Sequence, residues 1–144
     1  MPTLRLLAVP AALCLFAACS SDSTGSSNSA PPPPTANATT DINIPAGAST
    51  SGLPFQPNPK TVALNGGASV SIRWVNRDYS GTDYSSTTVA HHIVSDNNPA
   101  AFAPSQVLTA TAPSYTISLS APGDYPYHCS IHPTTMHGTI HVDP

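Results

Sequence analysis

Hydrophobic and polar residues alternate with a period of two through most of the C-terminal part of the chain. Val70, Ile72 and Trp74 alternate with polar neighbours, and the segment 114–119 repeats the pattern. This is the period of a β-strand with one buried face. The alternation therefore predicts an all-β domain over residues 41–144, a Greek-key β-sandwich of seven or eight strands. The shorter runs of this kind are residues 42–44, 61–64, 88–95, 106–109, 124–129 and 138–142.

The N-terminal segment has a different pattern. Arg5 precedes an apolar run that ends at Ala18, which is too short to span a bilayer and typical of a signal peptide over residues 1–18. The run ends in "LFAAC", which resembles a bacterial lipobox. This resemblance implies that Cys19 is lipidated and becomes the mature N-terminus, and Ser20 after it favours the periplasmic face of the outer membrane. The alternative is an ordinary signal cleavage that leaves a disordered leader.

Residues 19–40 contain mainly Ser, Thr, Asn and Pro and offer almost nothing to bury. We expect them to form a tether between the lipidated cysteine and the folded domain. The four consecutive prolines at 31–34 favour a locally stiff polyproline II segment with a rise of roughly 3 Å per residue.

The chain is poor in charge. Only 8% of its 144 residues are charged, and four Lys and Arg face seven acidic residues, all of them aspartate. A protein that binds nucleic acid needs a basic surface, so this class of partner is excluded.

Candidate metal ligands gather in one stretch, "YPYHCSIHPTTMHG", at residues 125–138. Cys14 lies in the predicted signal peptide and Cys19 in the lipobox, so Cys129 has no disulfide partner in the domain. A lone thiol in an exported protein is either buried and inert or bound to a metal. The neighbouring His132 and Met136 favour a metal-bound thiolate, because imidazole and thioether groups often bind soft or borderline metals together with a thiolate.

The alternation also predicts the direction of these side chains. Cys129 lies on the same face of its strand as Tyr127 and should point inward. In "TVAHHIVS", His91 shares the bulkier face with Val89 and Ile93, which favours His91 as the inward histidine. A single β-bulge would put His92 there instead.

Two imidazoles, one thiolate and a weakly held thioether form the ligand set of a blue-copper site. Zinc would gain little from the methionine. A buried site that its own ligands fill has no position for a substrate, so we expect one copper per chain and no enzymatic activity.

Three stretches resemble the signature blocks of the small cupredoxins, the group of plastocyanin, amicyanin and pseudoazurin. They are "VSIRWVNRD" at 70–78, "HHIVSD" at 91–96 and "PGDYPYHCSIHPTTMHGTI" at 122–140. The resemblance covers nearly the whole predicted domain and implies its cupredoxin-like fold.

The same resemblance implies a role for each ligand. Cys129 is the thiolate, His132 the loop histidine, Met136 the axial thioether and His91 the upstream histidine. Three residues separate His132 from Met136, where amicyanin-like loops have two and plastocyanin-like loops four. This difference leaves His137 as an alternative to Met136.

The sequence therefore predicts a monomeric type 1 copper protein, held by a lipid at the periplasmic face of the cell envelope. It would cycle between Cu(II) and Cu(I) as it carries electrons from a donor protein to an acceptor protein. The alternative is a copper carrier or chaperone that stores or delivers the metal without a redox cycle.

Overall fold

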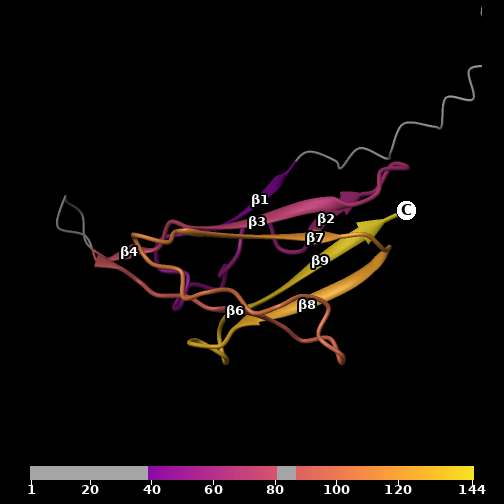
Figure 1. The fold of residues 1–144 in the computed structure, drawn as a ribbon. Helices are drawn as coiled ribbons and strands as arrows, with labels where there is room; N and C mark the ends of the chain where they lie inside the picture. The colour runs from indigo at the N-terminus through magenta and orange to yellow at the C-terminus, as the bar shows by residue number, and fades with distance from the viewer. Residues whose placement is uncertain (1–38, 81–86) are drawn as a thin grey trace, which may run out of the picture. The chain divides into compact units, whose positions relative to one another are not determined.

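The computed structural model describes residues 39–80 and 87–144, which fold as β-strands and connecting loops (Figure 1). The predicted signal peptide over 1–18, Cys19 and all but the last two residues of the predicted tether lie outside the described residues. In the described part of the chain, we find no helix with the length and apolar character needed to cross a membrane.

Two sheets form the sandwich. The first has the order β1 (Thr40–Ile44), β3 (Val70–Asn76) and β7 (Ser114–Leu119), in which β1 runs parallel and β7 antiparallel to β3. The second has the order β2, β9, β8 and β6, in which β2 and β9 are parallel and the other pairs antiparallel. Its strands are β2 (Lys60–Ala63), β9 (His137–Asp143), β8 (Gly123–Cys129) and β6 (Ile93–Ser95).

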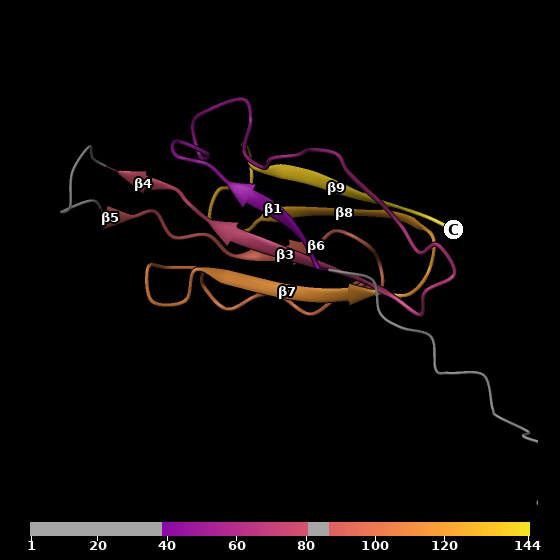
Figure 2. The same cartoon turned by 90° about the horizontal axis from the view of Figure 1, so that it is seen from above.

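A small hairpin of β4 (Tyr79–Ser80) and β5 (Thr87–Thr88) follows β3. It lies at one end of the sandwich, away from the C-terminus (Figure 2). The described residues thus contain nine strands, two of which have only two residues, and the predicted all-β sandwich is confirmed.

The core lies between the two sheets, as the alternation predicts. Along β3 every second residue is buried, including Trp74. Tyr127, on β8 of the opposite sheet, is buried as well. The two rings meet edge to face with centroids 5.1 Å apart, and Phe55 packs against Tyr127 at 4.9 Å. Full burial of each large apolar side chain stabilises the fold by roughly 1.5–3 kcal/mol.

Two strand predictions are wrong. Residues 106–109 form no strand, and only Leu108 makes an isolated bridge, to His91. The run predicted over 88–95 is interrupted between Thr88 and Ile93. The reason for the interruption is local: the amide of His92 donates to the sulfur of Cys129 instead of joining the β-ladder. The hairpin strand β4 was not predicted at all.

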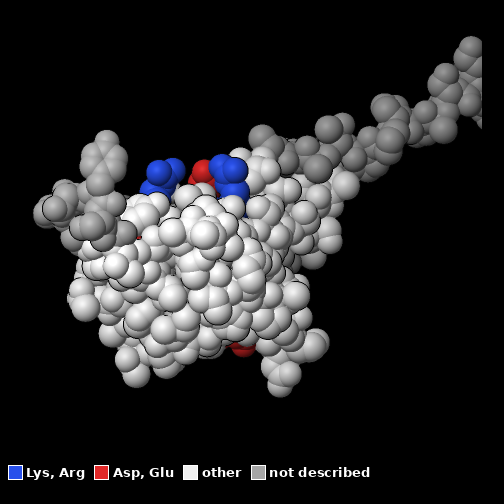
Figure 3. Space-filling view, turned by 60° about the vertical axis from the view of Figure 1, so that its left-hand side comes forward, with Lys and Arg blue, Asp and Glu red and all other residues white. Residues whose placement is uncertain are grey.

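Few charges mark the surface. Figure 3 shows basic side chains and one acidic group gathered at one edge of the face in view, whereas the rest of this face is nearly uncharged. In the first sheet, Arg73 forms a bidentate pair with Asp41, with N···O distances of 2.8 and 2.9 Å. The hydrogen bond from Arg73 lowers the pKa of Asp41, but such an exposed pair contributes little to the stability of the fold.

Candidate metal centre

Cys129 ends strand β8 and is fully buried, in agreement with the predicted inward direction. Two backbone contacts hold it. Its amide donates to the carbonyl of Met136 at 2.9 Å, and the amide of His92 donates to its sulfur at 3.4 Å. Cys129 is the one free cysteine among the described residues, so no disulfide occupies its sulfur.

His91 lies between β5 and β6 and is also fully buried. Its backbone forms an antiparallel bridge with Leu108, in which each amide donates to the other residue's carbonyl, at 3.2 and 2.7 Å. The ring Nδ1 lies 3.6 Å from the sulfur of Cys129. Burial lowers the pKa of His91 below the usual value of 6.5, although the nearby Asp78 acts in the opposite direction. A lowered pKa favours the neutral imidazole, which is the form that binds metals.

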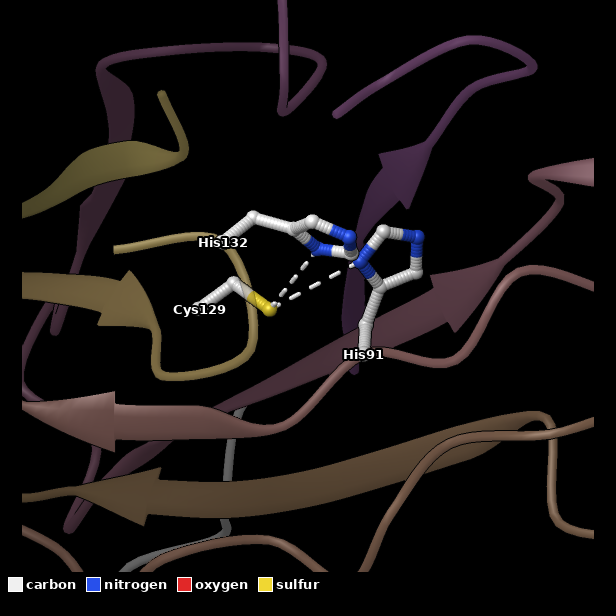
Figure 4. A group of neighbouring side chains, drawn as sticks. All are labelled: His91, Cys129 and His132. Carbon is white, nitrogen blue, oxygen red and sulfur yellow. Dashed lines mark hydrogen bonds between the residues drawn. The ribbon is translucent and has the colours of Figure 1, made fainter. Parts of the chain in front are cut away.

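His132 is brought to the same place by the tight loop after β8. Its amide donates to the carbonyl of Cys129 at 3.0 Å, and its Nδ1 lies 3.6 Å from the sulfur (Figure 4). The rings of His91 and His132 are tilted by 53°, with centroids 5.1 Å apart. In contrast to the other two residues, His132 is only half-buried.

These three side chains can hold a metal ion. Their donor atoms, one sulfur and two ring nitrogens, lie within 4.8 Å of one another. In the described ranges, no other group of three His, Cys, Asp or Glu side chains comes together in this way. A buried thiol without a disulfide, faced by two imidazole nitrogens, fits a metal with borderline to soft preferences.

The structure separates the two candidates for a fourth ligand. Met136 is fully buried, and its amide donates to the carbonyl of His132 at 3.1 Å. His137 is exposed, and its Nε2 lies 2.7 Å from the carbonyl oxygen of Pro133. Met136 thus lies inside the domain, whereas the imidazole of His137 lies at the surface and contacts the loop carbonyl.

Comparison with known proteins gives the family of the chain. Residues 42–143 match the family model described as copper binding proteins, plastocyanin/azurin family. The chain belongs to this family. Copper is therefore the metal of the site, and the single cluster in the described residues provides for one ion in this cupredoxin. No curated protein gives a significant match to the sequence.

Solved structures show the same fold. A purple cupredoxin from Nitrosopumilus maritimus is 22% identical, with a TM-score of 0.56, and the match covers 72% of this chain and 99% of the other. Oxidised plastocyanin from Dryopteris crassirhizoma is 21% identical, with a TM-score of 0.51 and coverages of 72% and 100%. The P52G mutant of amicyanin in its reduced Cu(I) form is 17% identical, with a TM-score of 0.51 and coverages of 76% and 86%.

His92 links the two segments that carry the candidate ligands of this cupredoxin. Its Nδ1 lies 2.6 Å from the hydroxyl of Ser130, and its carbonyl accepts the amide of the same serine at 2.9 Å. With its amide bonded to the sulfur of Cys129, His92 contacts the thiol without presenting its ring to it.

The remaining histidines of the cupredoxin domain pair with surface carboxylates. His128 contacts Asp96, and His141 lies between Asp124 at 2.5 Å and Asp143 at 3.1 Å. The alternation places both rings on the solvent side of their strands, and both are partly exposed. They belong to the surface and not to the metal centre.

Two buried polar residues next to the site were not predicted. Asn76 and Asp78 are each 1% exposed, and Asp78 contacts the ring of His91. The sequence could have indicated them. Every second residue of β3, including Trp74, is buried, and Asn76 and Asp78 continue this alternation. A polar side chain at such a position must find a partner inside the fold.

Proposed function

We propose that this cupredoxin is a type 1, or blue, copper electron-transfer protein of the bacterial cell envelope. One observation carries the proposal: a buried thiol lies 3.6 Å from each of two imidazole nitrogens in a domain of a copper-binding family. The proposed ligands are His91, Cys129, His132 and Met136. Copper bound there would supply a one-electron Cu(II)/Cu(I) couple.

The chain supports electron transfer by holding these side chains in place. Cys129 is restrained at its amide and at its sulfur, and the backbone of His91 is bridged to Leu108. Rigid ligands change little between two oxidation states, and little change favours fast exchange. Three of the four proposed ligands, His91, Cys129 and Met136, are fully buried, which favours an electron carrier over an enzyme that must admit a substrate to its metal.

His132 is the proposed entry and exit point for electrons. Its ring is half-buried, and the loop that carries it exposes the apolar residues Ile131 and Pro133. A donor and an acceptor protein would each dock on this uncharged loop in turn. Since the contact would be small and apolar, we expect weak and short-lived complexes with a monomeric carrier.

The proposed location depends on the N-terminal segment. Lipidation at Cys19 would anchor the protein to the periplasmic face of the membrane, and residues 19–40 would act as a leash. One acyl chain gives only marginal binding, whereas several chains together anchor a protein stably. A leash also keeps the domain at a high local concentration near membrane-bound partners.

The visible spectrum of the oxidised, copper-loaded protein tests the function. An intense red-region band from thiolate to Cu(II) is expected, together with fast electron self-exchange between the oxidised and reduced forms. A protein that binds copper tightly without this band or without measurable exchange would instead be a copper carrier or chaperone. Failure to bind copper would refute both functions.

The location has its own test, the variant Cys19→Ala. We expect this variant to release a soluble domain with an unchanged spectrum, because the tether separates the lipid from the fold. Cys14→Ala, in the predicted signal peptide, is the matched control and should stay in the membrane fraction. If Cys19→Ala also remains there after a salt wash, the lipoprotein hypothesis is wrong.

A further inference from the structure

A buried polar network lies behind the metal centre. Asn76 and Asp78 are 1% exposed and His91 is fully buried, and the side chains around them in the interior are mainly apolar. A carboxylate is almost never buried in this way unless it is paired. Among the described residues, the only ion pair of Asp78 is with His91.

Each carboxylate oxygen of Asp78 has its own donor. Oδ1 accepts the amide of Gly47 at 2.7 Å, and Oδ2 lies 3.1 Å from Nε2 of His91. Figure 4 shows this second ring nitrogen of His91 on the far side of the ring from Cys129. The imidazole is thus held between a carboxylate at Nε2 and the thiol at Nδ1.

Asn76 holds the carboxylate in this place. Its side-chain oxygen accepts the amide of Asp78 at 3.0 Å, and its side-chain nitrogen donates to the carbonyls of Val89 and Leu108 at 2.8 and 3.1 Å. Leu108 is also the backbone partner of His91. One network therefore restrains both the backbone and the ring of His91.

We propose that Asp78 is a positioning residue that orients His91 and lowers the reduction potential of the copper. This inference rests on the proposed function. With its proton fixed on Nε2 by the carboxylate, His91 presents the lone pair of Nδ1 toward Cys129 and His132. The negative charge makes the imidazole a stronger donor, which stabilises Cu(II) more than Cu(I).

The variant Asp78→Asn tests the proposal. An amide has one acceptor oxygen, so in either orientation its NH₂ group faces a donor, at Gly47 or at His91. Loss of such a ligand partner typically weakens metal affinity about 10- to 100-fold. We expect this loss mainly for Cu(II), and each tenfold loss confined to Cu(II) raises the potential by about 59 mV.

Asp124→Asn is the matched control. It removes the same charge from a carboxylate that also contacts a histidine ring, that of His141, but on the surface. The affinity and potential of this variant should equal those of the wild type. If Asp78→Asn also leaves both unchanged, Asp78 does not act on the copper.

A measurement on the wild type keeps the proposal testable if Asp78→Asn fails to fold. In the diamagnetic Cu(I) form, nitrogen NMR should show the proton of His91 on Nε2, with exchange far slower than for the exposed ring of His141. A proton on Nδ1, or exchange as fast as that of His141, would overturn the proposal. The proposed function fails separately: a wild type without the blue band refutes the function, whereas a blue wild type with an unaltered Asp78→Asn variant refutes only the role of Asp78.

Discussion

Gly138 is where a single added methyl group should destabilise the fold most directly. It lies in β9 opposite Tyr127 of β8, in the strand pair that leads to Cys129. A Cβ atom at Gly138 would lie 2.4 Å from Cζ and 2.5 Å from the hydroxyl oxygen of Tyr127. Since carbon atoms pack at about 3.5–4.0 Å, the overlap exceeds about 1 Å. Only a glycine fits beside this ring.

The Tyr127 ring cannot move away, because it is fully buried between Phe55 and Trp74. Overpacking of this kind costs about 1–3 kcal/mol. Without a clash, Gly→Ala in a strand would stabilise by roughly 0.5–1 kcal/mol. We therefore expect Gly138→Ala to lower the free energy of unfolding by up to about 2.5 kcal/mol net. For a domain of this size, the melting temperature should fall by up to about 10 °C.

Thermal and urea unfolding of the apo-protein measure the effect. Gly52→Ala is the control, because a Cβ there meets nothing within 4 Å and its effect should be small. Tyr127→Leu provides a second background without the Cζ and hydroxyl atoms. If Gly138→Ala costs as much there as in the wild type, the clash with the ring is not the cause and the reasoning is refuted.

Three further predictions concern the histidines and the thiol. Cys129→Ser should abolish the blue band, while circular dichroism shows that the apo-domain still folds; a band of full intensity would exclude Cys129 as a ligand. His91→Ala should greatly weaken copper binding in a titration, whereas His92→Ala should shift the spectrum only modestly, and the reverse order would exchange their roles. The hydrogen bond to Asp124 raises the pKa of His141 above 6.5, so the stabilisation from its protonated form is present at low pH and is lost as the pH rises through the raised pKa. An NMR titration should show this raised value, and Asp124→Asn should reduce it.

Much of the fold followed from the period of two, because burial in a sandwich depends on which face of the strand a residue occupies. Trp74, Tyr127 and Cys129 are buried as their parity predicts. The strand predictions failed where the backbone amides form hydrogen bonds that do not belong to a β-ladder. The amide of His92 bonds to sulfur, and Leu108 makes a single bridge, so neither segment forms a regular strand there. The sequence alone does not show which acceptor an amide will reach.

The convergence of His91, Cys129 and His132 could be predicted from the alternation along their strands and from their spacing in the sequence. Cys129 and His132 are close along the chain, and the lone cysteine required an explanation. The partner of His91 was beyond this reasoning, because Asp78 reaches it across 13 residues and binds Gly47 across 31. The alternation along a strand predicts that a polar residue is buried, but it does not identify the residue to which it will bond.

Asp78 also explains why the inward histidine of the pair is held so firmly. His91 lies outside a regular strand, so a β-ladder alone does not orient its ring. The carboxylate supplies the missing restraint at Nε2, and the loop at Gly47 supplies the donor that holds the carboxylate. The φ angle of Gly47 is 73°, in the left-handed region that favours glycine, so its amide is directed by a turn that few other residues would adopt. The orientation of His91, a proposed copper ligand, therefore depends on the turn at Gly47, far earlier in the chain.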